Sequence, residues 1–171
     1  GQGEYFPEGK QGPHIDQLMG EQAQRFLRGA AKQGRPFCLS VSFKAPHDPL
    51  TPAQAFTGLY RDERPYLSAP VPFREIGGLP PVFAESAWYA RLSWQQHCST
   101  ESRLHEFIRQ RYRLIAGVDA AVGHILEELK ALGLADNTII LFASDNGYYY
   151  GEHGLNTKFY LHEESVRVPL I

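Results

Sequence analysis

A helical stripe of apolar residues is the first clear pattern along the chain. Asp16 is a residue type that caps helices, and apolar side chains recur after it at spacings that place them on one helical face. The apolar members of this stripe are Met19, Ala23, Phe26, Leu27 and Ala30. The pattern predicts a helix over about residues 16–33, which Gly34 and Pro36 would end.

A longer stripe of the same kind lies in the second half of the chain. It begins at Arg111, its only polar member, and continues through about Leu132 at helical spacing. Gly133 then supplies a C-terminal stop, because glycine adopts the left-handed conformation that ends many helices. This segment is the most regular helical pattern in the sequence.

Each predicted helix is followed by a segment with the pattern of a strand. Residues 37–43 alternate large apolar with small side chains, and residues 138–143 are β-branched and apolar without alternation. The order helix, strand, long loop, helix, strand predicts a parallel βαβ unit with a right-handed crossover. The fold class we expect is therefore α/β, with a mostly parallel sheet and helices on both faces.

The stretch between the first strand and the second helix differs in character. Residues 45–85 are rich in proline and lack a long hydrophobic period, which is typical of an irregular excursion over the surface. We therefore expect residues 45–100 to form an irregular insertion or variable loop region. Such loops often determine specificity.

Composition and charge exclude several classes of function. The chain has 17 Lys and Arg against 19 Asp and Glu, so it lacks the basic excess of a nucleic-acid-binding protein. It has no apolar run of the roughly 18 residues that a membrane helix needs, so we expect no membrane partner. Its two cysteines, Cys38 and Cys98, are too few for a disulfide scaffold and lack the paired spacing of a zinc site.

Polar clusters follow both predicted strands. The segment 44–49 contains Lys44 and His47, and the segment 144–147 contains Asp145 and Asn146. Each alone is compatible with an ordinary turn or loop. If the strands are parallel, however, both clusters lie at the same edge of the sheet, where ligands bind in α/β proteins. Carboxylate and carboxamide oxygens select Ca²⁺ or Mg²⁺, while the lysine and histidine offer cationic donors to an anionic group.

A third cluster lies between residues 151 and 158. Glycines flank Glu152 and His153, which allows the backbone to approach a ligand closely, and Lys158 follows. His153 and His162 are nine positions apart without a cysteine partner, a spacing that argues against a zinc site. Lys158 alone would usually be a solvated side chain, and only its place beyond the second strand suggests an anion-binding role.

The order and spacing of these motifs resemble the sulfatase family, a branch of the alkaline phosphatase-like superfamily. The motifs that carry the likeness are Ser144-Asp145-Asn146-Gly147, Gly151-Glu152-His153-Gly154-Leu155, Lys158, Glu163-Glu164-Ser165-Val166-Arg167-Val168-Pro169, and the tract from Pro36 to Pro49. The likeness covers roughly residues 14–50 and 103–171. By this resemblance, the whole of residues 1–171 is part of one sulfatase catalytic domain.

The resemblance implies a Ca²⁺-dependent hydrolase of sulfate esters. Asp145 and Asn146 would bind the metal, and His47 and Lys158 would be catalytic residues that hold the sulfate and its bridging oxygen. Lys44 and His153 would contact the substrate. Cations around the sulfate stabilise the charge that develops as the S–O bond breaks, and a histidine or lysine near the leaving oxygen can act as a general acid.

One departure from the family concerns the nucleophile. The family motif is Cys or Ser followed by x-Pro-x-Arg and matured to formylglycine, and neither Cys38 nor Cys98 stands in that context. We therefore expect the chain to be the middle of a larger enzyme, with formylglycine upstream and no turnover by the segment alone. Unpaired sheet edges of such a segment would promote self-association.

Two alternative functions stay open from the sequence. A phosphatase or phosphodiesterase of the same superfamily would bind a tetrahedral anion in a similar way, although its zinc-dependent members place histidine where Asn146 stands. A non-catalytic sulfatase-like fragment is the other alternative. For the sulfatase hypothesis, the substrate would be a sulfated small molecule or carbohydrate, and the family resemblance suggests a periplasmic, secreted or lysosomal location.

Overall fold

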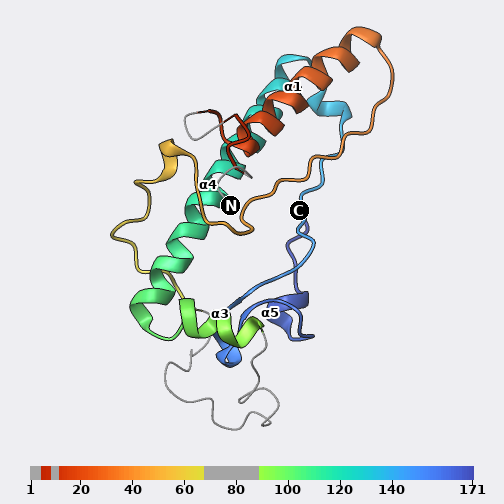
Figure 1. The fold of residues 1–171 in the computed structure, drawn as a ribbon. Helices are drawn as coiled ribbons and strands as arrows, with labels where there is room; N and C mark the ends of the chain where they lie inside the picture. Colours follow the sequence, from red (N-terminus) through yellow and green to blue (C-terminus); the bar gives the residue numbers. More distant parts are fainter. Residues whose placement is uncertain (1–4, 9–11, 68–88) are drawn as a thin grey trace. The chain divides into compact units, whose positions relative to one another are not determined.

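Helices dominate the described part of the chain, which comprises residues 5–8, 12–67 and 89–171 of a computed structural model (Figure 1). The α-helices are α1 (Ile15–Gln33), α3 (Tyr89–His97), α4 (Glu101–Ala131) and α5 (Glu163–Val166). Short 3₁₀ turns cover Gln54–Phe56, Ala135–Asn137 and Glu152–Gly154, and the strands are β1 (Tyr149–Tyr150) and β2 (Asn156–Thr157). Two units divide the chain: Gly1–Arg61 with Gln110–Ile139 (unit 1), and Asp62–Arg109 with Ile140–Ile171 (unit 2).

Helix α1 confirms the first predicted helix, with a different N-terminal cap. The N-cap residue is His14 rather than Asp16, and Nδ1 of His14 accepts a hydrogen bond of 3.3 Å from the backbone N–H of Asp16. A ring nitrogen can satisfy a first-turn N–H as a serine or aspartate oxygen does. At the other end, Gly34 adopts the expected left-handed conformation, with φ of 63°, and its N–H bonds to the carbonyls of Ala30 and Ala31.

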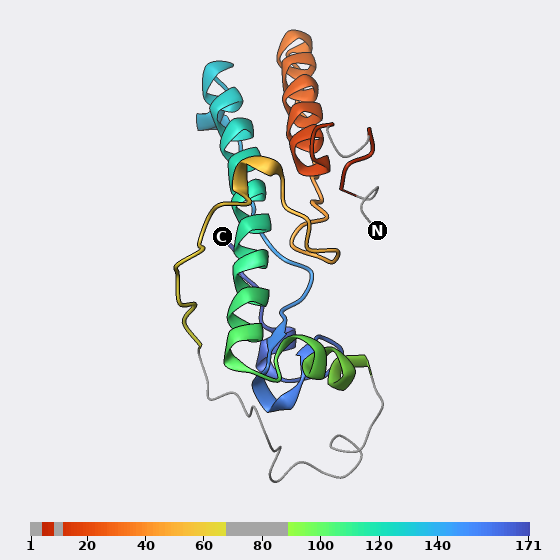
Figure 2. The same cartoon turned by 60° about the vertical axis from the view of Figure 1, so that its left-hand side comes forward.

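Within unit 1, helix α1 packs alongside the second half of α4 (Figures 1 and 2). The two helices run in the same direction, because contacts between them advance together along both. A Cβ on Gly20 would lie 3.3 Å from Ala121, Gln24 donates to the carbonyl of His124, and Arg28 pairs with Glu128. Parallel helices of this kind require a long return connection, as in βαβ units.

Helix α4 is longer than the sequence pattern predicts. It begins at Glu101 instead of Arg111, and its N-terminal turns pack through Leu104 and Ile108 against Trp94 and Cys98. Leu104, Phe107 and Ile108 of this extra length stand at helical spacing and are buried, and they extend the stripe toward the N-terminus of the helix. The predicted stop is confirmed, since Gly133 has a φ of 68°. Neither α4 nor another helix of the described ranges is long and apolar enough to cross a membrane.

The prediction that residues 45–100 are irregular throughout is wrong for its last part. Residues Tyr89–His97 form α3, whose buried side chains are Ala90, Ser93 and Trp94. The guanidinium of Arg91 lies 4.0 Å from the Trp94 ring centroid, a cation–π contact that covers the indole. Residues 45–67 are irregular apart from the 3₁₀ turn. The rest of the predicted loop, 68–88, lies outside the described residues.

The predicted parallel strands are not confirmed in the described ranges. Residues 37–43 are not assigned to a strand, and in the second segment only an isolated antiparallel bridge between Ala143 and Leu170 forms, with backbone hydrogen bonds between Phe142 and Ile171. The two-residue strands β1 and β2 form the one sheet found in the described ranges, and it is antiparallel. A strand needs the N–H and C=O groups of a neighbouring segment, and local hydrophobic pattern does not supply that neighbour.

Candidate functional site

Lys158 and Asn146 are brought together by the β1–β2 hairpin of unit 2. The antiparallel register pairs Tyr149 with Thr157 and Tyr150 with Asn156, so the chain returns toward the Asp-Asn-Gly turn just after β2. Nζ of Lys158 then donates a hydrogen bond of 2.9 Å to Oδ1 of Asn146. The structure therefore joins two of the predicted site residues directly.

The turn around Asn146 fixes the orientation of its amide. Nδ2 of Asn146 donates to the carbonyl of Gly147 at 2.7 Å, and Oγ of Ser144 donates to the carbonyl of Asn146 at 2.9 Å. With its N–H group bound in this way, the side chain presents its oxygen toward Lys158. Asp145 is exposed, so its carboxylate is accessible to an ion in solution.

The oxygen donors of this turn fit a hard cation. A carboxylate on Asp145 stands next to the carboxamide oxygen of Asn146, which retains acceptor capacity beside its bond to Lys158. Ca²⁺ accepts this donor type and takes six to eight oxygens, so these two residues form part of such a site. The chemistry of the pair therefore agrees with the expected metal.

Gly147 is required because the backbone around Glu164 and Arg167 passes close to its Cα atom. A Cβ at this position would lie 2.2 Å from the carbonyl oxygen of Glu164 and 2.8 Å from that of Arg167. The N–H of Gly147 also donates to the carbonyl of Ser165 at 2.8 Å. The glycine of the Asp-Asn-Gly turn thus lets helix α5 lie against the candidate metal-binding residues.

His47 lies in unit 1, in a loop whose backbone is held by buried groups. Its carbonyl accepts a hydrogen bond from the hydroxyl of Tyr5, a fully buried residue. Its ring is exposed, with Nδ1 2.9 Å from the carbonyl of Asp48. Lys44 lies nearby in the sequence, and its Nζ is 5.7 Å from the Tyr5 ring centroid.

Arg111 is a functional candidate that sequence reasoning missed. Its side chain is 2% exposed; Nη1 donates to the carbonyl of Pro46 at 2.5 Å, and Nη2 lies 3.4 Å from both carboxylate oxygens of Asp48. These groups flank His47 on both sides in the sequence. The signal that could have identified Arg111 is its place as the only polar member of an apolar helical stripe.

The predicted meeting of both clusters at one edge remains a prediction. His47 and Lys44 belong to unit 1, whereas Asp145, Asn146 and Lys158 belong to unit 2. Within unit 2 the structure joins Lys158 to Asn146, and Asp145 is the chain neighbour of Asn146.

His153 faces a carboxylate and a second histidine. It has a left-handed φ of 56° within the turn between Gly151 and Gly154, and its Nε2 lies 3.3 Å from Oε1 of Glu164. Its ring centroid is 4.5 Å from that of His162. The hairpin and α5 bring these residues together, although their sequence spacing argued against a joint site.

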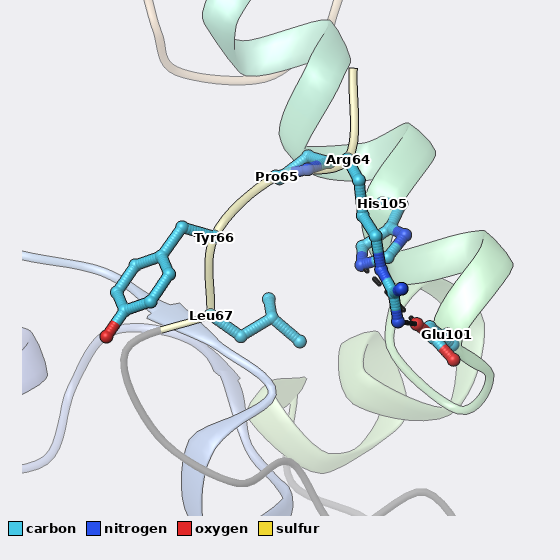
Figure 3. Close-up of a pocket in the computed structure, with 6 residues that line it drawn as sticks. All are labelled: Arg64, Pro65, Tyr66, Leu67, Glu101 and His105. Carbon is cyan, nitrogen blue, oxygen red and sulfur yellow. Dashed lines mark hydrogen bonds and ion pairs between the residues drawn. The ribbon is translucent and has the colours of Figure 1, made fainter. Parts of the chain in front are cut away.

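A pocket of about 350 Å³ in unit 2 lies apart from these residues (Figure 3). It is lined by Arg64, Pro65, Tyr66, Leu67, Glu101 and His105. Figure 3 shows Arg64 directed at Glu101, and their side chains form an ion pair of 2.5 Å. Because its arginine is already neutralised by a carboxylate, this pocket is a poor site for a sulfate group.

The chain matches the family model described as Sulfatase over residues 2–171. It is 34% identical to the choline-sulfatase of Rhizobium meliloti, over 80% of this chain and 26% of that protein. It is also 34% identical to the iduronate 2-sulfatase of Mus musculus, over 91% of this chain and 30% of that protein.

Solved structures give the same result for the fold. The crystal structure of a candidate sulfatase from Bacteroides fragilis superposes with a TM-score of 0.68 at 28% identity, covering 93% of this chain and 30% of that one. The chain thus spans less than a third of the length of each of these relatives.

Proposed function

Because this chain belongs to the sulfatase family, we propose that the protein containing it hydrolyses sulfate esters, and that this segment supplies part of the metal and sulfate site. The fold we propose for that protein is the α/β, mostly parallel sheet of the superfamily. Residues 37–43 and 138–143 would be strands in it, paired with segments outside their own sequence neighbourhood.

The observation that carries this proposal is the hydrogen bond between Lys158 and Asn146. It holds a cationic donor beside the hard oxygen of Asn146, and a cation next to a metal ligand suits an oxygen-rich anion bound at that metal. Lys158 would bind the sulfate and stabilise the negative charge that develops on the bridging oxygen as the S–O bond breaks.

Asp145 and Asn146 are the residues that would hold Ca²⁺ in this proposal. A bound Ca²⁺ would supply positive charge that polarises the sulfate oxygens. Other oxygen ligands and the nucleophile, which we expect to be formylglycine, would come from other parts of the protein, because Cys38 and Cys98 do not stand in the required motif.

His47 is the proposed general acid, because its ring is exposed while its backbone is held by Tyr5. A histidine can donate a proton to the leaving oxygen near neutral pH. Lys44 and His153 would add positive charge at the substrate. The substrate class is a sulfated small molecule or carbohydrate, and the proposed location of the protein is periplasmic, extracellular or lysosomal.

The proposal is tested by Lys158→Ala in the full-length protein that contains this chain. Removing one donor from an anion site lowers turnover about 100- to 1,000-fold, so sulfate release from an aryl sulfate in the presence of Ca²⁺ should fall by this factor. The matched control is Lys130→Ala, because Lys130 is an exposed lysine in the last turn of α4. This control should retain full activity.

Two results would contradict the proposal. One is equal activity of the Lys158 and Lys130 variants. The other is hydrolysis of an aryl phosphate, with no sulfate release, by a zinc-loaded protein, a result that would favour the phosphoesterase alternative.

A further inference from the structure

Three side chains of unit 2 lie close together, and the proposed hydrolysis gives the three no joint role. They are His153, His162 and Glu164, and each offers one ligand atom such that all three atoms lie within 4.8 Å of one another. We propose that they form a binding site for a divalent transition-metal ion, and that this ion is Zn²⁺. The site is separate from the oxygen donors of Asp145 and Asn146. This inference goes beyond the proposed sulfate hydrolysis.

The spacing of the ligand atoms fits tetrahedral zinc. At usual Zn–N and Zn–O distances, two ligands of a tetrahedral site are about 3.3 Å apart. Nε2 of His153 and Oε1 of Glu164 are 3.3 Å apart already. The three ligand atoms lie within 4.8 Å of one another, so a rotation of the exposed His162 side chain would bring its ligand atom to the same spacing.

The chemistry of the three ligands distinguishes this site from the Asp-Asn-Gly turn. Two imidazoles and one carboxylate select zinc and similar transition metals, whereas Ca²⁺ and Mg²⁺ prefer oxygen donors alone. With both histidines neutral, the group carries one negative charge, which favours a dication. His153 and His162 are exposed and the Glu164 side chain is 26% exposed, so an ion can enter and keep a water ligand.

Tyr149 supplies the outer contact that metal-binding histidines usually have. Its hydroxyl lies 2.8 Å from Nδ1 of His162, and Tyr149 itself is fully buried. A fixed partner on one ring nitrogen orients the imidazole so that the other nitrogen can bind a metal. In this role the hydroxyl oxygen of Tyr149 would accept the Nδ1–H of His162, which leaves the lone pair of Nε2 for the metal.

Zinc at this site would compete with the substrate role proposed for His153. A histidine that binds zinc has no free lone pair and adds no separate cationic donor. The site would therefore make the protein sensitive to zinc through residues outside the Ca²⁺ donors.

The test is titration of the full-length protein with ZnCl₂ at neutral pH, followed by calorimetry. We expect one zinc ion to bind at a site that depends on His162. Loss of an outer contact lowers metal affinity about 10- to 100-fold, so Tyr149→Phe should weaken binding by that factor, and His162→Gln by more than about 100-fold. Glu164→Gln, which keeps the size of the side chain, should weaken binding as His162→Gln does.

The matched control is His124→Gln, because His124 is an exposed histidine of α4. This variant and Asp145→Asn should bind zinc as the unchanged protein does. The inference is overturned if the unchanged protein binds no zinc, if the His162 and His124 variants bind it equally, or if Asp145→Asn abolishes binding. The experiment reads out zinc binding and not sulfate release, so its result stands whether or not the protein hydrolyses sulfate esters.

Discussion

At the scale of single residues, Arg111 connects helix α4 to the loop that carries His47. Its guanidinium is buried and bonds to the carbonyl of Pro46 and the carboxylate of Asp48. A charged group with so little exposure is stable only while these partners remain. The loop conformation around His47 thus depends on a residue that is distant in the sequence.

We predict that Arg111→Met lowers the free energy of unfolding by about 1.5–3 kcal/mol, the usual effect of losing hydrogen bonds to a charged group. Urea denaturation measures this change. Arg25→Met is the control, because Arg25 is exposed on α1, and its effect should stay within about 0.5 kcal/mol. Equal stability of the two variants would show that Arg111 does not hold the loop.

At the scale of elements, the parallel pair of α1 and α4 is joined at its surface by Arg28 and Glu128. Both nitrogen–oxygen contacts of the guanidinium are short, 2.9 and 2.6 Å, which makes the pair bidentate. The hydrogen bond and charge of Arg28 lower the pKa of Glu128 below its usual value of 4.5. The contribution of this ion pair to the stability of the α1–α4 contact should therefore decrease at acid pH.

The sign of this dependence follows from the lowered pKa. The contribution of Glu128 is fully present above about pH 4.5, its unfolded value, and is lost as pH falls through the lower folded value. We predict that Glu128→Gln flattens the loss of stability below pH 4.5, measured by thermal unfolding across acid pH. Glu127→Gln, at the exposed neighbouring position, should leave the profile of the unchanged protein intact.

At the scale of the whole molecule, unit 2 exposes apolar side chains along two extended segments. Backbone hydrogen bonds of 2.9 and 3.0 Å join Phe142 and Ile171, while Leu141 and Leu170 are 76% and 75% exposed. Extended segments with unpaired edges and apolar side chains are templates for pairing with another chain.

We predict that the 171-residue chain by itself self-associates, and that Leu141→Lys with Leu170→Lys shifts it toward monomer in sedimentation velocity. The control is Leu161→Lys, since Leu161 is 93% exposed but lies outside the two extended segments. A compact monomer of the unchanged chain would contradict this prediction.

Local pattern predicted those parts of the fold that local interactions stabilise. The stripes and glycine stops of α1 and α4 were read correctly because helix hydrogen bonds join residues four positions apart. Helix α3 was missed because it is short, and the packing of its buried Ala90 and Trp94 is not visible in the local pattern. The predicted parallel strands are not confirmed, because local pattern does not specify the segments with which they would pair.

The sequence by itself determined the family and the residue types of the candidate site, because the order and spacing of the motifs can be read directly from the chain. Only the tertiary structure decided which of these residues meet. It joined Lys158 to Asn146 through a hairpin, and it placed His162 beside His153 and Glu164 despite their unpromising spacing. The physical reason is that side-chain contacts depend on how the backbone turns back on itself, and a linear pattern does not record that path.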